Sequence, residues 1–381
     1  MTGVGDDDES ARRHERVVAA AVRAAYAWSG RAKHPDAMLE ISRMTGVVME
    51  ARGRGFEPTT PMGLVESLRS PLGGLLSFAA AVDPAVAEAV LLDSGDEVTD
   101  AVYDVGCEYA QQLDAALETA PWLPSWARMR AAQIRAAVFA SLVEAGDQEA
   151  YVKARRFLIE LPAGKREDIA DELAETGARC AATYQDIPAD QQHAARDKRW
   201  WWPCPLCRWP MHVTSETVRC RYRPHRAAFQ LAAAQRPGTG APRLLRVRED
   251  GPAAPRGRPA DGAACVDASI WRHVVVPGAT EIRIASDWGK NGVTVTLWPK
   301  LDTYDLDVRT KTEHLCYDVK EYQSARRLVD DLRAKPPAAT VLLPATHEHQ
   351  LDIIRSALPG IPVTTERQAR RRVRQAAREA V

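Results

Sequence analysis

The chain has 381 residues, of which 45% are hydrophobic and 27% are charged, so it is long enough for about two or three domains with real cores. This composition excludes a wholly disordered chain and a fibrous repeat. The 51 basic and 51 acidic residues cancel, but residues 1–195 carry 19 basic and 31 acidic side chains, and residues 196–381 carry 32 and 20. The two halves are therefore expected to differ in structure and in partners.

The sequence also argues against a membrane protein and against a disulfide-stabilised protein. No apolar run approaches the roughly 20 residues of a membrane helix, and the first residues are acidic, unlike the start of a signal peptide. We therefore expect no membrane partner and a cytoplasmic location. In a reducing compartment, the seven cysteines are not expected to form a disulfide framework, and the clustering of three of them indicates a metal site.

The first half of the chain is predicted to be helical. Residues 1–10 are expected to be a disordered acidic tail. Residues 11–195 have apolar positions at helical spacing, interrupted by turn signals, which predicts an all-helical domain. This region shows no catalytic pattern, so we expect it to serve in protein interaction or as a scaffold.

A zinc ribbon is predicted over residues 196–235. Its four candidate ligands have two, twelve and four residues between successive members: Cys204, Cys207, Cys220 and His225. Two close pairs separated by a short hairpin are typical of a closed tetrahedral Zn²⁺ site, which stabilises a small module and performs no chemistry. His212 is an alternative fourth ligand, although it would lie inside the hairpin.

The ribbon and the following linker, residues 236–268 with connecting strands, are rich in arginine and tryptophan. Between residues 195 and 260 there are 14 basic and 4 acidic residues. Arginines that hold phosphates, with tryptophans that stack on bases, would form a nucleic-acid face. Alternatively, the tryptophans pack inside and the arginines are solvated. The candidate nucleic-acid contacts here are Arg208, Arg221, Arg223 and Arg226.

Residues 269–381 have a mixed α/β pattern. We expect a strand at 274–276, a helical or irregular stretch at 279–290, a strand at 293–299, a hairpin at 301–322, and then helix, strand, helix, strand and helix. The His-Glu-His run at 347–349 opens one helix, where its side chains are expected to be exposed. The last helix carries a stripe that could grip a DNA backbone, which includes Arg370, Arg371 and Arg374.

The hairpin contains the strongest catalytic signal. If it folds symmetrically about residues 311 and 312, Asp305 lies directly opposite Asp318. Alternation then places these aspartates, with Lys320, on one face. The other face would belong to the core and is formed by Tyr304, Leu306, Val308, Leu315, Tyr317 and Val319.

Two opposed carboxylates repel one another, so this pairing predicts a compensating cation. Mg²⁺ suits two aspartates with a backbone carbonyl, and Lys320 on the same face could orient or deprotonate an attacking water. The pattern therefore predicts hydrolysis of a phosphodiester at Asp305, Asp318 and Lys320. Asp302 and Asp307 are alternatives for the first aspartate.

The Asp305-x12-Asp318-Val-Lys320 pattern, on a hairpin followed by helix, strand and helix, resembles the PD-(D/E)XK nucleases. The resemblance covers about residues 270–381 and implies a restriction-endonuclease-like fold, a Mg²⁺ cofactor and DNA endonuclease activity. It also implies that an acidic residue of the preceding helix joins the metal site, for which Glu281 is the candidate. The usual proline before the first aspartate is replaced by Tyr304.

The whole arrangement resembles the nuclease-like, Y-type component of prokaryotic PIWI-RE defence islands. The resemblance rests on the helical region, the CPLCRWPM ribbon and the LWPKLDTYDLDV and YDVKEY segments. It implies antiviral or plasmid defence with a PIWI-RE protein and a helicase as partners. A double-strand cut requires two such centres and is compatible with a homodimer. The alternative is a DNA-binding or scaffold subunit without catalysis.

Overall fold

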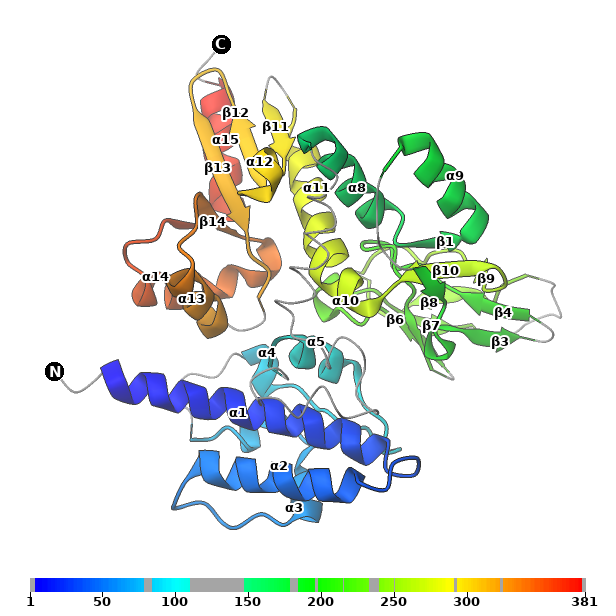
Figure 1. Ribbon diagram of the computed structural model, residues 1–381, viewed down its shortest axis with the longest axis vertical. Coiled ribbons are helices and arrows are strands. Elements are labelled where there is room, and N and C mark those ends of the chain that lie inside the picture. Colours follow the sequence, from blue (N-terminus) through cyan, green and yellow to red (C-terminus); the bar gives the residue numbers. More distant parts are fainter. Residues whose placement is uncertain are drawn as a thin grey trace. The chain divides into compact units, whose positions relative to one another are not determined.

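The computed structural model describes the greater part of the chain (Figure 1). The described residues are 4–78, 84–109, 147–178, 184–195, 198–214, 216–232, 240–249, 251–290, 293–322 and 325–378. They fall into two compact units, which are described separately. The first contains the described residues up to Tyr109 and two short segments, 221–223 and 322–326, and the second contains the rest.

The first unit is helical, as predicted. Its elements are α1 (Val4–Ser29), α2 (Ala37–Arg52), α3 (Pro61–Ser67), the short 3-10 helix η1 (Leu72–Gly74), α4 (Pro84–Ala87) and α5 (Asp100–Tyr109). Helix α1 packs on α2, where Arg23 and Glu40 form a buried ion pair. Thr60 caps α3 by accepting a hydrogen bond from the Gly63 amide at 3.0 Å.

Helix α1 corrects the prediction for the N-terminus. It begins at Val4, so most of the stretch predicted as a disordered tail is helical. Acidic residues are favourable near the positive N-terminal end of a helix dipole, which accounts for a helix that starts in an acidic sequence. The prediction treated this acidity only as a sign of disorder.

The second unit begins with helices and three small sheets. The helices of this part are α8 (Gln148–Glu160), α9 (Arg166–Thr176), η3 (Ala189–Gln191) and η4 (Arg223–His225), the last of which straddles the boundary between the units. The first sheet has the order β1-β10-β2, formed by Ala163–Lys165, Ala263–Val266 and Tyr184–Asp186. The second has the order β3-β4-β9, formed by His193–Ala195, Lys198–Trp201 and Arg258–Pro259. The third runs β5-β6-β7-β8, formed by His212–Val213, Thr217–Arg219, Ala228–Leu231 and Leu244–Arg246.

The prediction of an all-helical domain over residues 11–195 is wrong at its C-terminal end. Strands β1, β2 and β3 lie within this range. Each has three residues and pairs with a strand later in the chain, β10 or β4. Strands this short show no alternation of their own, since their partners in the sheet stabilise them.

The third part of this unit is an α/β fold around a five-stranded mixed sheet. The strands, in the order β11-β12-β13-β14-β15, are Thr294–Leu297, Leu306–Arg309, His314–Val319, Thr340–Leu343 and Val363–Thr365. The first three are antiparallel and the last three are parallel. The helices are α10 (Ala268–Ile270), the π-helix η5 (Trp271–Val275), α11 (Val276–Trp288), α12 (Pro299–Asp302), α13 (Ala325–Ala334), η6 (Ala345–Gln350), α14 (Leu351–Ala357) and α15 (Glu366–Arg378).

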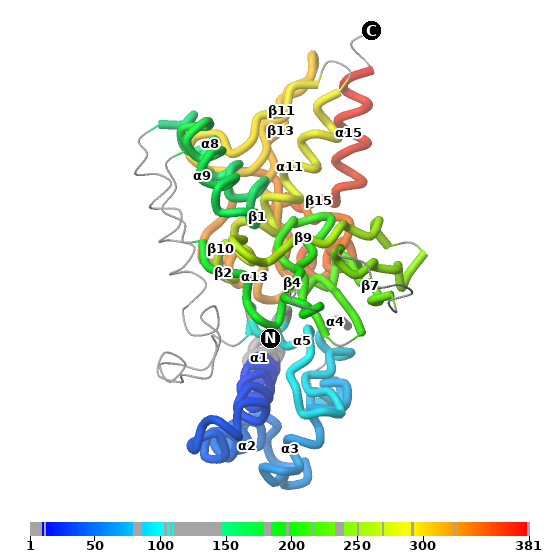
Figure 2. The backbone as a smooth tube through the Cα atoms, turned by 90° about the vertical axis from the view of Figure 1, so that its right-hand side faces the viewer, coloured from blue at the N-terminus to red at the C-terminus, as the bar shows by residue number. Residues whose placement is uncertain are grey.

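The core of the fold lies between one face of this sheet and two helices. Helices α11 and α15 lie side by side (Figures 1 and 2), joined by a bidentate ion pair between Arg283 and Glu366 at 2.7 and 2.8 Å. The Trp288 ring packs edge-on against Tyr317, with 5.6 Å between their centroids. The buried cluster comprises Ile284, Ala285, Trp288, Leu306, Val308, Leu315, Tyr317, Val319, Leu342, Ala369 and Val373.

The hairpin register is confirmed, and one strand prediction is wrong. Leu306 pairs with Tyr317 and Val308 with Leu315, which is the predicted symmetry about residues 311 and 312. By contrast, the Val-Val-Val run at 274–276 lies in η5 and α11 rather than in a strand. All three valines are fully buried, so tertiary packing overrides their strand propensity.

No helix in the described ranges combines the length and the apolar character that crossing a bilayer requires.

Candidate metal centre and nuclease site

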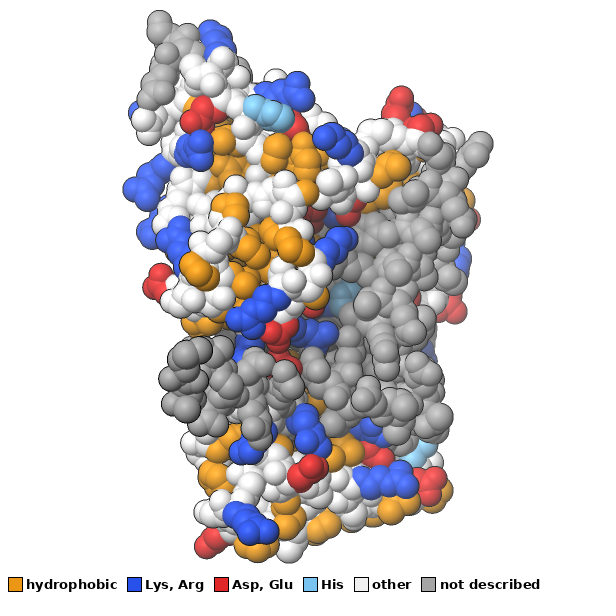
Figure 3. All heavy atoms as spheres, turned by 60° about the vertical axis from the view of Figure 1, so that its left-hand side comes forward, with side chains coloured by type: hydrophobic (Ala, Val, Ile, Leu, Met, Phe, Trp, Pro, Cys, Tyr) orange, Lys and Arg blue, Asp and Glu red, His pale blue; other side chains and the backbone are white. Residues whose placement is uncertain are grey.

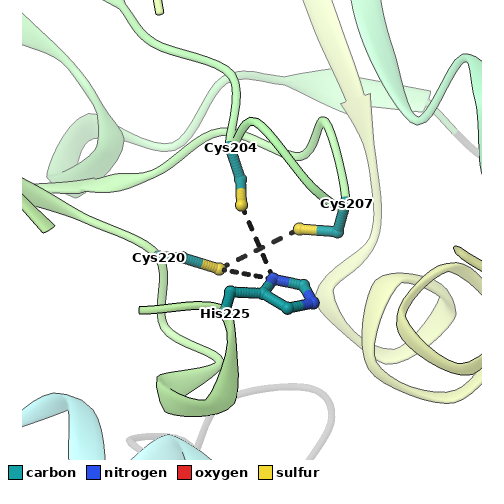
Figure 4. Close-up of side chains that lie close together, drawn as sticks. All are labelled: Cys204, Cys207, Cys220 and His225. Atoms are coloured by element: carbon teal, nitrogen blue, oxygen red, sulfur yellow. Dashed lines mark hydrogen bonds between the residues drawn. The ribbon is translucent and has the colours of Figure 1, made fainter. Parts of the chain in front are cut away.

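The predicted ribbon ligands come together in one cluster. Figure 4 shows the side chains of Cys204, Cys207, Cys220 and His225 pointing toward a common centre. His225 Nδ1 lies 3.5 Å from Cys204 Sγ and 3.4 Å from Cys220 Sγ, and Cys207 Sγ lies 3.9 Å from Cys220 Sγ. His212, the alternative fourth ligand, is not part of this cluster.

These separations fit a tetrahedral metal ion. With Zn–S and Zn–N bonds of about 2.3 and 2.0 Å, tetrahedral geometry places two sulfurs about 3.8 Å apart and a sulfur and a nitrogen about 3.5 Å apart. The three cysteines are buried and free of disulfides, and the donor set of three thiols and one imidazole is one that Zn²⁺ prefers. The residues therefore fit a structural zinc ion.

A neighbouring tryptophan supports the cluster from outside. Trp271 Nε1 donates a hydrogen bond to Cys207 Sγ at 3.2 Å, and its ring stacks on Trp209 at 4.5 Å between centroids. Trp209 Nε1 in turn donates to the Val266 carbonyl at 2.9 Å. Such outer contacts orient the ligands and tune their basicity. Trp271 belongs to η5, so it links the ribbon to the start of the α/β fold.

The ribbon tryptophans do not form a base-stacking surface. The rings that were expected to be available to bases are all buried, namely Trp200, Trp201, Trp202 and Trp209. The alternative interpretation, in which they pack inside, is therefore correct. Each tryptophan has a large apolar surface, and its burial helps to stabilise a small module that has only short strands.

The predicted nucleic-acid arginines divide into two groups. Arg221 is buried, and Arg370 is half-buried and paired with Asp287 at 2.7 Å. The remaining five are exposed: Arg208, Arg223, Arg226, Arg371 and Arg374. On the face shown in Figure 3, basic side chains lie at several separate places among hydrophobic and acidic ones. The exposed five keep their predicted role as a proposal.

The carboxylates of the nuclease site come from two helices, a turn and a strand. Glu281 lies on α11, Asp302 is the last residue of α12, Asp305 lies in the turn between α12 and β12, and Asp318 lies on β13. The Asp305 amide donates to the Tyr317 carbonyl at 3.1 Å, but the paired positions of the hairpin begin at Leu306 and Tyr317, so Asp305 lies one residue before the ladder and its place opposite Asp318 stays a prediction. Asp305 Oδ2 accepts the Val319 amide at 2.7 Å.

Asp305 Oδ1 lies 3.9 Å from Arg155 Nη2, a longer ion pair than the hydrogen bond at Oδ2. Burial, together with the nearby Glu281 and Asp318 carboxylates, raises the pKa of Asp305 well above its usual range. Lys320 Nζ donates to Asp318 Oδ1 at 2.7 Å. Two carboxylates beside a lysine fit a Mg²⁺ site, since Mg²⁺ completes its shell with water and substrate oxygens.

Glu281 is held by other groups. Its Oε2 atom accepts hydrogen bonds from Arg155 at 2.8 Å and from the Trp298 indole. Burial raises the pKa of Glu281, although Arg155 opposes this effect. The four ribbon ligands have ligand atoms that all lie within 4.8 Å of one another, and Glu281, Asp305 and Asp318 do not meet this spacing. Glu281 is therefore not one of the metal ligands that we propose.

The alternative first aspartates are also engaged elsewhere. Asp302 forms an ion pair with Arg155. Asp307 accepts hydrogen bonds from Tyr304 Oη at 2.9 Å and Arg309 Nε at 2.9 Å, and it pairs with His314 at 2.8 Å. Tyr304, predicted on the core face, is buried, and its hydroxyl makes the contact with Asp307.

Asp307, His314 and Cys316 form a second group whose ligand atoms lie within 4.8 Å of one another. The Asp307 carboxylate is already satisfied by Tyr304 and Arg309 on the same hairpin.

Sequence reasoning missed Arg155, which lies on α8. Its side chain is 3% exposed and contacts Glu281, Asp302 and Asp305. Burial alone would lower the pKa of Arg155, but Glu281 and Asp302 raise it. The available signal was its place on the apolar face of α8, four residues after Tyr151. An arginine at such a position is rarely buried without an acidic partner.

Two family models match regions described above. Residues 13–165 match the model described as pPIWI_RE three-gene island domain Y. Residues 278–381, which hold the mixed sheet, match the model described as REase associating with pPIWI_RE. No curated protein and no solved structure matches the chain. The chain therefore joins a region similar to the pPIWI_RE island domain Y to a region similar to the REase that associates with pPIWI_RE.

Proposed function

We propose that this protein is a Mg²⁺-dependent DNA endonuclease that acts in a prokaryotic defence system. The observation that carries the proposal is the closeness of the Asp305 and Asp318 carboxylates, with Lys320 bound to Asp318, within the region that matches the REase model. A retired site would not be expected to keep two neighbouring carboxylates whose repulsion costs stability.

The charge of the site supports a divalent cation. Four carboxylates, those of Glu281, Asp302, Asp305 and Asp318, face two cations, Arg155 and Lys320. Fully ionised, this set has a net charge of −2. Buried charge without compensation is costly, so the set favours binding of a single Mg²⁺ ion.

The chain's own residues account for the rest of the reaction. Mg²⁺, when bound, polarises the scissile phosphate and lowers the pKa of a water molecule. Asp305 and Asp318 would hold the ion through their carboxylates, and the Val319 carbonyl would be a further ligand. Lys320 would orient the attacking water and offset charge on the phosphorane. The expected products carry 5′-phosphate and 3′-hydroxyl ends.

We also propose that Zn²⁺ fills the ribbon cluster as a structural ion. The separations among Cys204, Cys207, Cys220 and His225 support this assignment. The exposed arginines, Arg208, Arg223, Arg226, Arg371 and Arg374, would contact DNA phosphates without reading sequence.

Partner proteins are part of the proposal. The words "three-gene island" and "associating with pPIWI_RE" in the matching family descriptions support joint action with a PIWI-RE protein. We propose a helicase as the other partner and a cytoplasmic setting. Two nuclease centres in a homodimer would allow both strands to be cut.

Cleavage of plasmid and single-stranded DNA, with Mg²⁺ or EDTA and with or without the partners, tests the proposal. Asp318→Ala and Lys320→Ala should each lower cleavage by about 10²–10³-fold or more, since each removes a group aimed at the reacting phosphate. Asp352→Ala, at an exposed carboxylate on α14, serves as the control and should cleave normally. Zinc content and the fold should be retained in every variant.

Unchanged cleavage by both site variants would sink the assignment. Tight DNA binding without cleavage, under every combination of partner and metal, would instead support the scaffold alternative.

A further inference from the structure

Helix α8 contributes two side chains to the nuclease centre, although it lies in the range of the Y-domain match and more than 100 residues before the sheet. Arg155 Nη2 lies 2.8 Å from Glu281 Oε2, and Arg155 also pairs with Asp302. Its nearest approach to Asp305 Oδ1 is longer, at 3.9 Å. The guanidinium therefore binds two carboxylates firmly and leaves Asp305 largely free.

The pocket around Arg155 orients its guanidinium. Tyr151 Oη accepts a hydrogen bond from Nη1 at 3.2 Å, and the guanidinium carbon lies 4.6 Å from the centre of the Trp298 ring. Stacking on an aromatic face and forked donation to carboxylates are properties of arginine that lysine lacks. The site thus requires arginine for its geometry as well as for its charge.

The second residue is Gln148, which binds the turn before Asp305. Its Nε2 atom donates to the Trp298 carbonyl at 2.7 Å, and its Oε1 atom accepts the Leu301 amide at 2.7 Å. Trp298, Lys300 and Leu301 in this turn have φ between 50° and 53°, in the left-handed region. Each such residue costs about 1–2 kcal/mol, so the turn persists only because other groups hold it.

The turn determines the position of Asp305. The Trp298 amide donates to the Asp305 carbonyl at 2.8 Å, so the two ends of the turn are joined. A shift of the turn would move Asp305 relative to Asp318. Because misplacement by about 1 Å can cost ~10²-fold in rate, this contact matters for catalysis.

The close packing of α8 against α11 fixes the positions of Arg155 and Gln148 relative to the nuclease centre. A Cβ atom added at Gly278 on α11 would lie 2.2 Å from Ile159 Cδ1 on α8. Figure 1 shows the two helices next to one another. Only a residue without a side chain allows this contact.

We propose that Arg155 and Gln148 are positioning residues of the nuclease centre. Arg155 neutralises Glu281 and Asp302 and keeps them off the metal, so that Asp305 and Asp318 alone supply carboxylates to it, while Gln148 holds the turn that presents Asp305. This inference rests on the proposed function. It makes α8 part of the nuclease, which therefore does not begin at residue 269.

Mn²⁺ binding and DNA cleavage by the full, zinc-loaded chain test the inference together. Arg155→Met should bind Mn²⁺ at least about tenfold more tightly, because Glu281 and Asp302 lose their cation. It should nevertheless cleave about 100-fold more slowly, because the carboxylates rearrange. Adding Glu281→Gln to this variant restores the net charge of −2 and should bring the affinity back to within about threefold of wild type.

Two further variants complete the design. Arg156→Met is the matched control, since Arg156 is exposed on the same helix and pairs with Glu160; both readouts should match wild type. Arg155→Lys keeps the charge and covers the case in which Arg155→Met does not fold. It should retain wild-type Mn²⁺ affinity and lose cleavage. Gln148→Ala should weaken both Mn²⁺ binding and cleavage, with thermal unfolding within a few degrees of wild type.

The outcomes separate the inference from the proposed function. Weaker or unchanged Mn²⁺ binding by Arg155→Met, or wild-type cleavage by Arg155→Lys, would show that Arg155 only stabilises the fold. A wild-type chain that neither binds Mn²⁺ nor cleaves DNA would overturn the proposed function itself.

Discussion

At the scale of single residues, burial decides which side chains carry chemistry. Arg155 and Glu281 are both about 3% exposed and satisfy one another, whereas Asp318 and Lys320 keep about 15% of their side chains exposed. Groups that must meet substrate need this access. The division therefore agrees with a positioning role for the first pair and a catalytic role for the second.

His347 illustrates the same point outside the site. It was predicted to be exposed in the His-Glu-His run but is 2% exposed, with Nδ1 at 2.9 Å from Thr346 Oγ1. Burial lowers the pKa of His347 to about 3. The unfolded chain, with a pKa of about 6.5, takes up a proton below that pH that the folded chain does not. Stability should therefore fall as the pH falls from about 6.5 toward 3.

Urea unfolding at pH 7 and pH 5 measures this effect. His347 should account for about 2 kcal/mol of the loss in unfolding free energy between these values. His347→Gln should remove that part of the pH dependence, and His349→Gln, at the exposed neighbour, should not. Equal pH dependence in wild type and His347→Gln would show that the buried imidazole is not the cause.

At the scale of elements, the contact between α8 and α11 leaves the least room for an added side chain. Gly278→Ala places a methyl group against Ile159 and should lower the unfolding free energy by about 1–3 kcal/mol, as overpacking usually does. Gly46→Ala on α2 is the control, because its added Cβ meets nothing within 4 Å. It should be stabilising by up to about 1 kcal/mol, as alanine is the better helix former. Thermal or urea unfolding of the two variants gives the comparison, and a neutral Gly278→Ala would contradict the close packing.

Sequence patterns predicted the hairpin well because its register depends on local alternation. The apolar residues from Leu306 to Val319 lie on one face in the structure, and the ribbon ligands converge as their spacing indicates. The contribution of α8 was not predictable in this way. It depends on Arg155 meeting Glu281 across 126 positions of the chain, and no local period records such a contact. The short strands β1 to β3 were missed for the same reason.

At the scale of the whole molecule, the neutral net charge combines regions with different roles. The excess of basic residues is concentrated between residues 195 and 260, around the ribbon. Basic and acidic residues are nearly equal in number in the REase region, where arginines pair with carboxylates of neighbouring helices, as Arg283 pairs with Glu366. Arg371 and Arg374 on α15 are exposed, as the proposed contacts with DNA phosphates require.

The ribbon should depend on its metal. We expect one zinc ion per chain, and its removal by a strong chelator should unfold the ribbon, because small zinc modules derive most of their stability from the ion. Cys220→Ser should lose the zinc, while Cys316→Ser, at a half-exposed cysteine outside the ribbon, should keep it. Colorimetric zinc release with thermal unfolding measures both. Loss of zinc from Cys316→Ser would mean that the second group, with Asp307 and His314, binds metal as well.

A crystal structure of the zinc-loaded protein soaked in Mn²⁺, with anomalous data, tests the proposed metal centre at Asp305 and Asp318 most directly. We predict one Mn²⁺ peak about 2.1–2.2 Å from Asp305 Oδ1 and an oxygen of Asp318, with Arg155 still bound to Glu281 and Asp302. A peak coordinated by Glu281 and Asp302 in place of Arg155, or no peak between Asp305 and Asp318, would contradict the proposed centre.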